Sequence, residues 1–429
     1  MPGLIDCVTA ALDARLSLDA DRPVALALSG GGDSMALLHL AADWCARRGR
    51  RLLTLTVDHR LHRDSAVWTA FAGEAARNLG ADWRTLSWDG PKPATGLPAA
   101  ARAARHALLA DTARQAGARV ILMAHTADDI AESDWMRDQG ATLGALRDWS
   151  PSPAWPQGRG LMLLRPLLTA SRADLRALLR ARNALWLEDP ANADPRFLRS
   201  QARMALQSET PSFSSSSRGP TATASTIVEA MKSSPMIWSG LVTLPRAVPA
   251  RTLAAALLSV SGQAAPPRSP RLTALHARLA SDSEVTATLS GARIQASGQT
   301  LLITREPGRT GLPAAALPPN APAVWDGRFE ITAPEPGWSV GALKGRMASL
   351  APVDQAIVKR LPASARPALP VLFRDADPRP LLAWRVAETR CLVAGRLIAA
   401  AGRIGHEDQL THSSGETPPA DLFLNRSGG

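Results

Sequence analysis

One short stretch near the start of the chain carries the residue types that bind phosphate. It consists of Ser29, Gly30, Gly31, Gly32, Asp33 and Ser34. The glycines let the backbone adopt positive φ and bring its N–H groups close to an anion. The two serines can donate hydroxyl hydrogen bonds to phosphate oxygens, and Asp33 can orient the loop or hold a Mg²⁺ ion. We predict a phosphate-binding loop, with a plain glycine turn as the alternative. Because no lysine follows the last glycine, it is not a mononucleotide P-loop.

A second cluster of ionisable residues follows the apolar run 120–124 and consists of His125, Asp128, Asp129 and Glu132. If a helix begins at His125, offsets of 3, 4 and 7 place all four side chains on one stripe. Three neighbouring carboxylates repel one another, so the stripe favours a cation as its partner. Mg²⁺ on a nucleotide and the ammonium group of an amine substrate are both candidates, and a solvated acidic face is the alternative.

Arginines recur on two further predicted helices. Arg102 and Arg105 lie on the first turns of a helix over 99–116, and Arg199 and Arg203 fall on one face of a helix that opens near Pro195. Such arginines can clamp phosphate or substrate, or they can lie on a solvated face. For the second helix, contact with RNA phosphates and simple solvation are equally good interpretations.

The elements that must position these residues alternate between strand and helix. Apolar runs at 24–28, 52–57 and 120–124 are separated by segments with helical spacing, which is typical of a parallel α/β sheet. Ligands of such sheets bind beyond the carboxyl ends of the strands. Asp58 and His59, which follow the second run, are therefore expected to line a nucleotide pocket beside the glycine loop.

The Ser-Gly-Gly-x-Asp-Ser pattern resembles the pyrophosphate-binding loop of the ATP pyrophosphatase (PP-loop) superfamily. Within it, the chain resembles the tRNA(Ile)-lysidine synthetase family over residues 24–203. The motifs that carry this resemblance are the loop 29–34, Val57-Asp-His59, Ala101-Arg102-x-x-Arg105, Ala124-His-x-x-Asp-Asp-x-x-Glu132, Arg165-Pro-Leu-Leu168, and Glu188-Asp-Pro-x-Asn192-x-Asp194 with Arg199 and Arg203.

The chain departs from the family pattern at three places. Ser133 stands where the family usually has Thr, and His106 stands where it usually has Tyr. Asp138-Gln-Gly140 replaces a basic segment, which weakens any transfer of RNA-contacting residues from there. The ATP site is not affected.

The resemblance implies a ligase that uses ATP and Mg²⁺ to join free L-lysine to C2 of the wobble cytidine of a tRNA(Ile) with a CAU anticodon. An adenylylated cytidine would be the intermediate, and AMP and pyrophosphate would be released. Two alternatives stay open: another PP-loop tRNA-modifying enzyme of the thiolase type, and a basic RNA-binding protein with a degenerate ATP site.

The same resemblance implies roles for individual residues. Loop residues 29–34 with Asp58 and His59 would bind ATP, and Asp33 would also hold the metal. Asp129 and Glu132 would hold the lysine, with His125 or Asp128 near the reacting phosphate and Asp33 and Asp129 also in catalytic roles. The further substrate-binding residues would be Arg102, Arg105, Arg165, Asn192, Arg199 and Arg203.

Composition is consistent with a polyanionic partner. Lys and Arg number 49 against 38 Asp and Glu, giving a formal charge of +11. A general preference for arginine is the alternative. Neither a signal peptide nor a long apolar segment is recognisable, so we expect a cytoplasmic protein that binds tRNA and neither membrane nor DNA. The oligomeric state stays open, with a homodimer as one option.

We expect an α/β, parallel-sheet ATP pyrophosphatase (adenine nucleotide α-hydrolase-like) domain followed by helical and small α+β C-terminal domains. The expected boundaries are a catalytic domain at 1–206, a Ser/Thr-rich linker at 207–234, a helical and hairpin tRNA- or substrate-binding domain at 235–307, an α+β domain at 308–403, and a disordered tail at 404–429.

Overall fold

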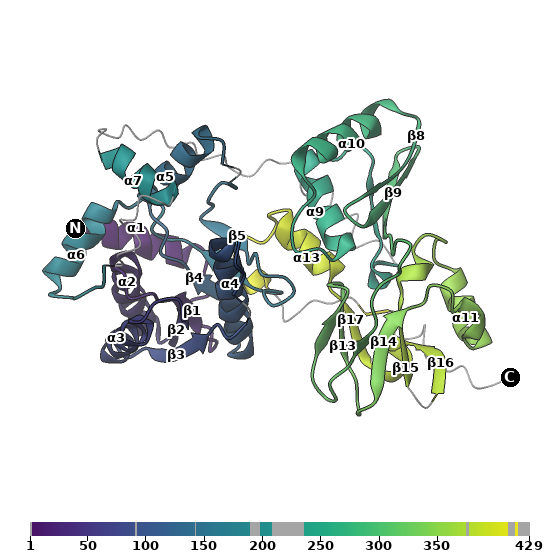
Figure 1. Ribbon diagram of the computed structural model, residues 1–429, viewed down its shortest axis with the longest axis horizontal. Helices are drawn as coiled ribbons and strands as arrows, with labels where there is room; N and C mark the ends of the chain where they lie inside the picture. Colours follow the sequence, from purple (N-terminus) through teal and green to yellow (C-terminus); the bar gives the residue numbers. More distant parts are fainter. Residues whose placement is uncertain are drawn as a thin grey trace. The chain divides into compact units, whose positions relative to one another are not determined.

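The computed structural model of the chain describes residues 2–90, 92–141, 143–188, 198–207, 236–374, 377–410 and 417–418. The chain divides into two compact units. One contains residues 1–219 together with 404–410, and the other contains residues 220–403 and 411–429. Figure 1 shows the helices and strands of both units. Each unit has its own buried apolar core. Asn192 and nearly all of the predicted linker lie outside the described residues.

The first unit is built on a six-stranded sheet in the order β3-β2-β1-β4-β6-β5. All neighbours are parallel except β5 and β6. Its strands are β1 (Val24–Ala27), β2 (Leu52–Asp58), β3 (Asp82–Ser87), β4 (Val120–Leu122), β5 (Trp149–Pro151) and β6 (Met162–Leu164). The predicted parallel α/β fold is confirmed, because the apolar runs form the buried strands of this sheet.

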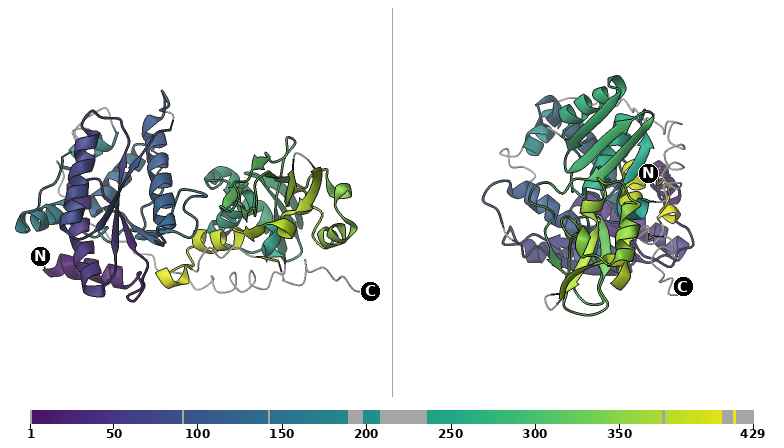
Figure 2. Two further views of the ribbon diagram at one scale, coloured as in Figure 1. Left: turned by 90° about the horizontal axis from the view of Figure 1, so that it is seen from below. Right: turned by 90° about the vertical axis from the view of Figure 1, so that its right-hand side faces the viewer.

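Helices cover both faces of this sheet, with α2 and α3 on one face and α4 on the other (Figures 1 and 2). They are α1 (Pro2–Asp13), α2 (Gly32–Arg48), α3 (Ser65–Asn78), α4 (Leu97–Gln115), α5 (Ala127–Asp138), α6 (Arg172–Ala181) and α7 (Leu198–Gln207). Because β1, β2 and β4 are adjacent and parallel, the segments that follow them emerge at one edge of the sheet.

The second unit combines three antiparallel sheets with helices. The strands are β7 (Val242–Pro245), β8 (Glu284–Leu289), β9 (Ala292–Ser297), β10 (Thr300–Arg305), β11 (Ala315–Ala316), β12 (Ala323–Trp325), β13 (Phe329–Thr332), β14 (Trp338–Ala342), β15 (Pro370–Arg374), β16 (Asp377–Leu382) and β17 (Glu388–Cys391). They form sheets in the orders β7-β10-β9-β8, β11-β14-β15-β16 and β12-β13-β17. The helices are α9 (Ala250–Ser261), α10 (Ser269–Ser281), α11 (Pro352–Lys359), α12 (Ala383–Val386) and α13 (Val393–Ala400).

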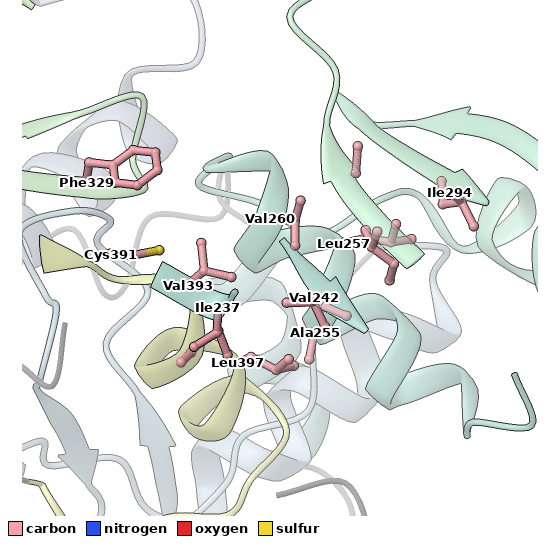
Figure 3. Close-up of a cluster of buried hydrophobic side chains, with 14 of the residues drawn as sticks. Ile237, Val242, Ala255, Leu257, Val260, Ile294, Phe329, Cys391, Val393 and Leu397 are labelled. Atoms are coloured by element: carbon pink, nitrogen blue, oxygen red, sulfur yellow. The ribbon is translucent and has the colours of Figure 1, made fainter. Parts of the chain in front are cut away.

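One hydrophobic core runs through much of this second unit. It contains Ile237, Val260 and Ile294 from the part before residue 307, and Phe329 and Leu397 from the part after it (Figure 3). The boundary that we expected at residue 307 therefore does not separate two cores. No helix among the described residues is both long and apolar enough to cross a membrane.

Residues 404–410 return to the first unit, although we expected a disordered tail to begin at residue 404. The carboxylate of Glu407 accepts hydrogen bonds from Arg50 Nη1 at 2.8 Å, Arg22 Nε at 2.8 Å and the backbone N–H of Ser17 at 2.9 Å. Trp149 Nε1 donates to the carbonyl of Ile404 at 2.7 Å. These contacts order the segment, so the predicted start of the tail is too early.

Candidate active site

The glycine loop connects β1 to the first turn of α2. Gly30 has φ of +83°, a conformation that glycine adopts without steric cost. Ser34 Oγ donates to the carbonyl of Gly31 at 2.8 Å and accepts the backbone N–H of Ser29 at 3.2 Å. The two serine hydroxyls also lie 3.0 Å apart. The serines therefore hold the loop in shape, and an anion bound there would face the positive end of the α2 dipole.

Arg176 of α6 lies directly over this loop, a position that was not predicted from the sequence. A Cβ added to Gly32 would stand only 1.8 Å from Arg176 Nη1, so the glycine makes room for the guanidinium. Arg176 Nη1 is also 3.1 Å from Asp33 Oδ1. The phosphate-binding loop is thereby flanked by a positive side chain from another element.

The helix after β4 begins later than we predicted. Thr126 is the N-cap and α5 starts at Ala127, so His125 precedes the helix and does not share a helical stripe with the carboxylates. Oδ2 of Asp129 accepts the backbone N–H of Thr126 at 2.8 Å and its hydroxyl at 3.2 Å. That capping interaction shifts the helix start, because the carboxylate satisfies a backbone N–H that would otherwise lack a partner.

Asp129 and Glu132 face arginines from two other helices. Arg172 at the start of α6 has Nη2 at 2.9 Å from Asp129 Oδ1, Nη1 bonded to Glu132 Oε1, and Nε at 3.3 Å from Asp33 Oδ2. On α7, Arg199 bridges Asp129 and Glu132, and Arg203 Nε lies 2.7 Å from Glu132 Oε1. The cation favoured by the acidic residues is, in this structure, a group of guanidinium ions.

These contacts fix the charge of the acidic pair. Burial on its own would raise the pKa of Asp129, but Arg172 and Arg199 outweigh burial and hold the pKa below its usual value. The pKa of Glu132 is lowered in the same way, with hydrogen bonds from Arg172, Arg199 and Arg203 opposing burial. Asp33 differs, because burial prevails there over Arg172 and Arg176 and raises its pKa. The acidic pair is therefore ionised at neutral pH.

Asp128 points to a different partner from its two acidic neighbours. Its Oδ2 accepts the backbone N–H of Arg172 at 2.8 Å. Arg172 is the first residue of α6, so Asp128 satisfies one of the unpaired N–H groups of that helix terminus. This places Asp128 in a positioning role towards Arg172.

A group of basic side chains lies near Arg199. Burial, and then the positive charges of Arg102 and Arg199, lower the pKa of Arg105, whose buried Nε has no hydrogen-bond partner in the described part of the chain. Burial followed by the charge of Arg102 lowers the pKa of Arg165 to about 10. Buried arginines that repel one another favour binding of an anion between them.

His125 belongs to this basic group and is neutral. Its Nδ1 accepts a hydrogen bond from Arg165 Nε at 3.2 Å. Burial and the Arg165 charge lower the pKa of His125 to about 4. Because Nδ1 is the acceptor, the ring proton of the neutral imidazole lies on Nε2. His125 is thus a hydrogen-bond donor at neutral pH rather than a cation.

Asp58 and His59 lie at the carboxyl end of β2, the neighbour of β1. Asp58 Oδ1 accepts the backbone N–H of Arg60 at 2.8 Å and so shapes its own turn. The ring of His59 packs edge-on against Trp88 with centroids 6.0 Å apart. Burial, then the charges of Arg105 and Lys92, lower the pKa of His59. Asp58 and His59 therefore lie at the same edge of the sheet as the glycine loop.

The structure thus brings together Asp33, Asp129 and Glu132 through shared arginines, and Arg102, Arg105, Arg165 and His125 around a second, basic group. Arg172 and Arg176 were missed. The Ser171 capping box predicted the helix correctly. Nothing in the sequence distinguishes Arg172 and Arg176 from solvated arginines on a helix surface.

The acidic residues do not form a preassembled metal site. Among the described residues, no group of three His, Cys, Asp or Glu side chains is arranged to hold a metal ion. Mg²⁺ commonly binds through one or two carboxylates together with substrate phosphates, so a lone Asp33 beside the loop is compatible with a metal that arrives on a nucleotide.

The sequence of this chain is similar to those of known proteins. A family model described as a PP-loop domain matches residues 8–210. A tRNA(Ile)-lysidine synthase from Caulobacter vibrioides is 45% identical over 415 residues, covering 94% of this chain and 99% of that protein. One from Mesorhizobium japonicum is 36% identical over 343 residues and covers 73% of each chain. One from a Bradyrhizobium species is 47% identical over 184 residues, covering 42% of this chain and 51% of that protein.

The fold and the glycine loop define the first unit as a PP-loop domain, a class of ATP-utilising domain. The match to the Caulobacter protein extends over almost the whole of both chains. The chain belongs to the tRNA(Ile)-lysidine synthase family, as its sequence motifs predicted.

Proposed function

We propose that this enzyme joins L-lysine to C2 of the wobble cytidine in a tRNA(Ile) with a CAU anticodon, and that ATP activates the cytidine. Membership of the family makes it an ATP-using tRNA-modifying ligase. The observation that best supports the amine substrate is the buried, ionised pair Asp129 and Glu132 beside the glycine loop.

In the first step, the C2 carbonyl oxygen of the cytidine attacks the α-phosphate of ATP and pyrophosphate leaves. The backbone N–H groups of the loop and the N-terminus of α2 would stabilise the departing charge. Arg176 lies over the loop and is placed to contact the same phosphates. Mg²⁺ held by Asp33 and the nucleotide would neutralise further charge there; for this, Asp33 must exchange at least one arginine partner for the ion.

In the second step, the side-chain amine of lysine attacks C2 and AMP leaves. Asp129 and Glu132 would bind the ammonium form and orient it, since charge-assisted hydrogen bonds to carboxylates are strong and directional. The amine must lose protons during the step. His125 carries its proton on Nε2 and would donate a hydrogen bond to the reacting phosphate, which leaves the role of base to another group.

The lysine site is tested with Asp129→Asn and Glu132→Gln. We expect each change to raise the KM for lysine by about 10–100-fold, the loss of one charge-assisted hydrogen bond of roughly 1.5–3 kcal/mol. The measurement is incorporation of labelled lysine into the tRNA, with mass analysis of the nucleosides. Asp134→Asn is the matched control, because Asp134 lies on the same helix with an exposed side chain. An unchanged KM and turnover in both variants would refute the assignment.

A further inference from the structure

Arg199 occupies the place that the proposed function gives to the lysine ammonium group. Its guanidinium bridges the two carboxylates, with Nη2 2.5 Å from Asp129 Oδ1 and Nε 2.8 Å from Glu132 Oε2. An amine substrate bound by Asp129 and Glu132 needs these same oxygens. The inference below therefore rests on the proposed lysine site.

Every oxygen of the two carboxylates already accepts a hydrogen bond from the described residues. Asp129 Oδ1 is shared by Arg172 and Arg199, and its Oδ2 accepts the backbone N–H and the hydroxyl of Thr126. Glu132 Oε1 is shared by Arg172 and Arg203, and its Oε2 accepts from Arg199. The side chains of Asp129 and Glu132 are only 8% and 2% exposed. Because each oxygen of Asp129 already has two donors, an ammonium bound to both carboxylates must displace one of them.

Arg199 is the arginine that can leave most readily. Its side chain is 41% exposed, against 21% for Arg172 and 24% for Arg203. Arg172 is further held by Asp128 through its backbone N–H and by Asp33 through its side chain. Water screens the ion pairs of a more exposed guanidinium and makes them weaker, so its displacement costs less.

Charge repulsion also opposes an added cation. Four guanidinium groups, those of Arg172, Arg176, Arg199 and Arg203, already lie around the carboxylates. An ammonium placed among them is repelled by each of these groups. An anion that enters nearby, or a guanidinium that moves away, reduces this repulsion.

Two further arginines near Arg199 are candidates to bind an anion. The positive charge of Arg199 acts on both Arg102 and Arg105. The buried Nε of Arg105 has no hydrogen-bond partner among the described residues, so it can still donate to an anion. A phosphate bound at these side chains would convert the repulsion felt by Arg199 into attraction.

We propose that Arg199 is a displaceable counter-ion: it holds Asp129 and Glu132 until a phosphate group binds beside Arg102 and Arg105, then turns to the phosphate and opens the amine site. Lysine binding is consequently coupled to the arrival of an anionic substrate. The phosphate can come from ATP or from RNA.

The coupling is measured by isothermal titration of L-lysine into the full chain alone, with a non-hydrolysable ATP analogue, with inorganic pyrophosphate, and with tRNA(Ile). For the unmodified chain we expect at least one of these anions to tighten lysine binding by about tenfold, within the ~5–150-fold typical of coupled sites. The anion that tightens lysine binding identifies the source of the phosphate.

Arg199→Gln should bind lysine tightly without any anion, and added anion should change its affinity by less than about twofold, because the counter-ion is gone. Arg199→Lys keeps the charge and should retain coupling. Arg180→Gln is the matched control, because Arg180 is exposed on α6; it should behave as the unmodified chain. Circular dichroism of each variant checks folding.

Equal coupling in the unmodified chain and in Arg199→Gln overturns the inference and leaves the lysine site intact. If the unmodified chain binds lysine equally well with and without every anion, the inference also fails. If lysine binds under no condition, or if Asp129→Asn and Glu132→Gln leave binding unchanged, the proposed lysine site itself is wrong, and the inference falls with it.

Discussion

Buried ionisable side chains in the first unit are held in one charge state by their neighbours. Asp129 and Glu132 stay ionised because arginines surround them. His106 is 5% exposed and lies near Arg102, Arg105 and Arg165, and burial together with these charges lowers its pKa to about 3. It is therefore neutral at every pH at which the enzyme is expected to work. Its buried Nε2 has no hydrogen-bond partner among the residues that the structure describes.

His106 should make the first unit sensitive to acid. Its pKa is about 3 in the folded chain and 6.5 by the ordinary value, so below pH 6.5 the unfolded chain binds a proton that the folded chain does not. Stability is therefore lost as the pH falls from 6.5 towards 3, by about 2 kcal/mol at pH 5. His106→Phe should reduce the stability lost between pH 7.5 and pH 5 by about 2 kcal/mol in urea unfolding, and the lowered pKa values of His125 and His59 leave a residual loss.

The exposed His62 supplies the control for this comparison. His62→Gln should lose as much stability between the two pH values as the unmodified chain. If His106→Phe keeps the full acid sensitivity, His106 is not the group responsible.

The arginines of the site depend on how three helices begin and pack. Thr126 and Asp129 cap α5, and Ser171 and Asp174 form a capping box at the start of α6. Asp128 connects these two termini. It lies in the first turn of α5, and its carboxylate accepts the first backbone N–H of α6. Helix α7 packs against α5 and brings Arg199 and Arg203 to the carboxylates.

Asp128 should act through the position of α6. In Asp128→Asn the amide oxygen can still accept the backbone N–H of Arg172, whereas Asp128→Ala loses the acceptor and about 0.5–2 kcal/mol of helix stabilisation. We expect the Ala variant to raise the KM for lysine severalfold and the Asn variant to stay near normal. Steady-state kinetics and thermal unfolding are the measurements. If both variants lose turnover equally, Asp128 acts in the chemistry itself.

The parts of the site that depend on local residue patterns could be predicted from the sequence. The loop 29–34, the strands that precede the site residues and the Ser171 capping box follow from glycine spacing, apolar periodicity and cap chemistry. The sequence did not identify Arg172 and Arg176, because an arginine on a helix looks the same whether it meets water or a carboxylate 139 residues away, as Arg172 does at Asp33. The site residue Asn192 lies outside the described residues and stays a prediction.

The first unit is completed by a segment from near the other end of the chain. Arg50 and Glu407, each with a side chain only 1% exposed, form a buried ion pair, and Arg22 adds a second guanidinium. We call residues 404–410 the clasp. Sequence patterns could not reveal it, because the two charged partners are 357 positions apart.

Removal of the clasp carboxylate should destabilise the first unit. Glu407→Ala leaves Arg50 buried without its partner and should cost roughly 3–5 kcal/mol, measured by hydrogen exchange of the β1 and β2 amides. Asp408→Ala is the control, because the side chain of Asp408 is 56% exposed, and its loss should cost less than about 1 kcal/mol. Equal destabilisation by the two changes would show that the buried Arg50–Glu407 pair stabilises the unit no more than the exposed carboxylate of Asp408 does.

The clasp also predicts a dependence on acid. Burial opposes ionisation of Glu407, but Arg50 and Arg22 prevail and hold its pKa below the ordinary 4.5. Its stabilisation is therefore complete above pH 4.5 and is lost as the pH falls through the lower, folded-state value. In the same exchange experiment, the difference between the unmodified chain and Glu407→Ala should shrink below pH 4.5.

The clasp has a consequence for biosynthesis. At about 5–20 residues per second, a ribosome needs roughly 20–70 s to travel the 357 positions that separate Arg50 from its partner. During that interval the nascent α/β layer exists with an uncompensated guanidinium in its interior. The unit translated first therefore cannot reach its mature stability until Glu407 has left the exit tunnel, after residues 220–403 of the second unit have been translated.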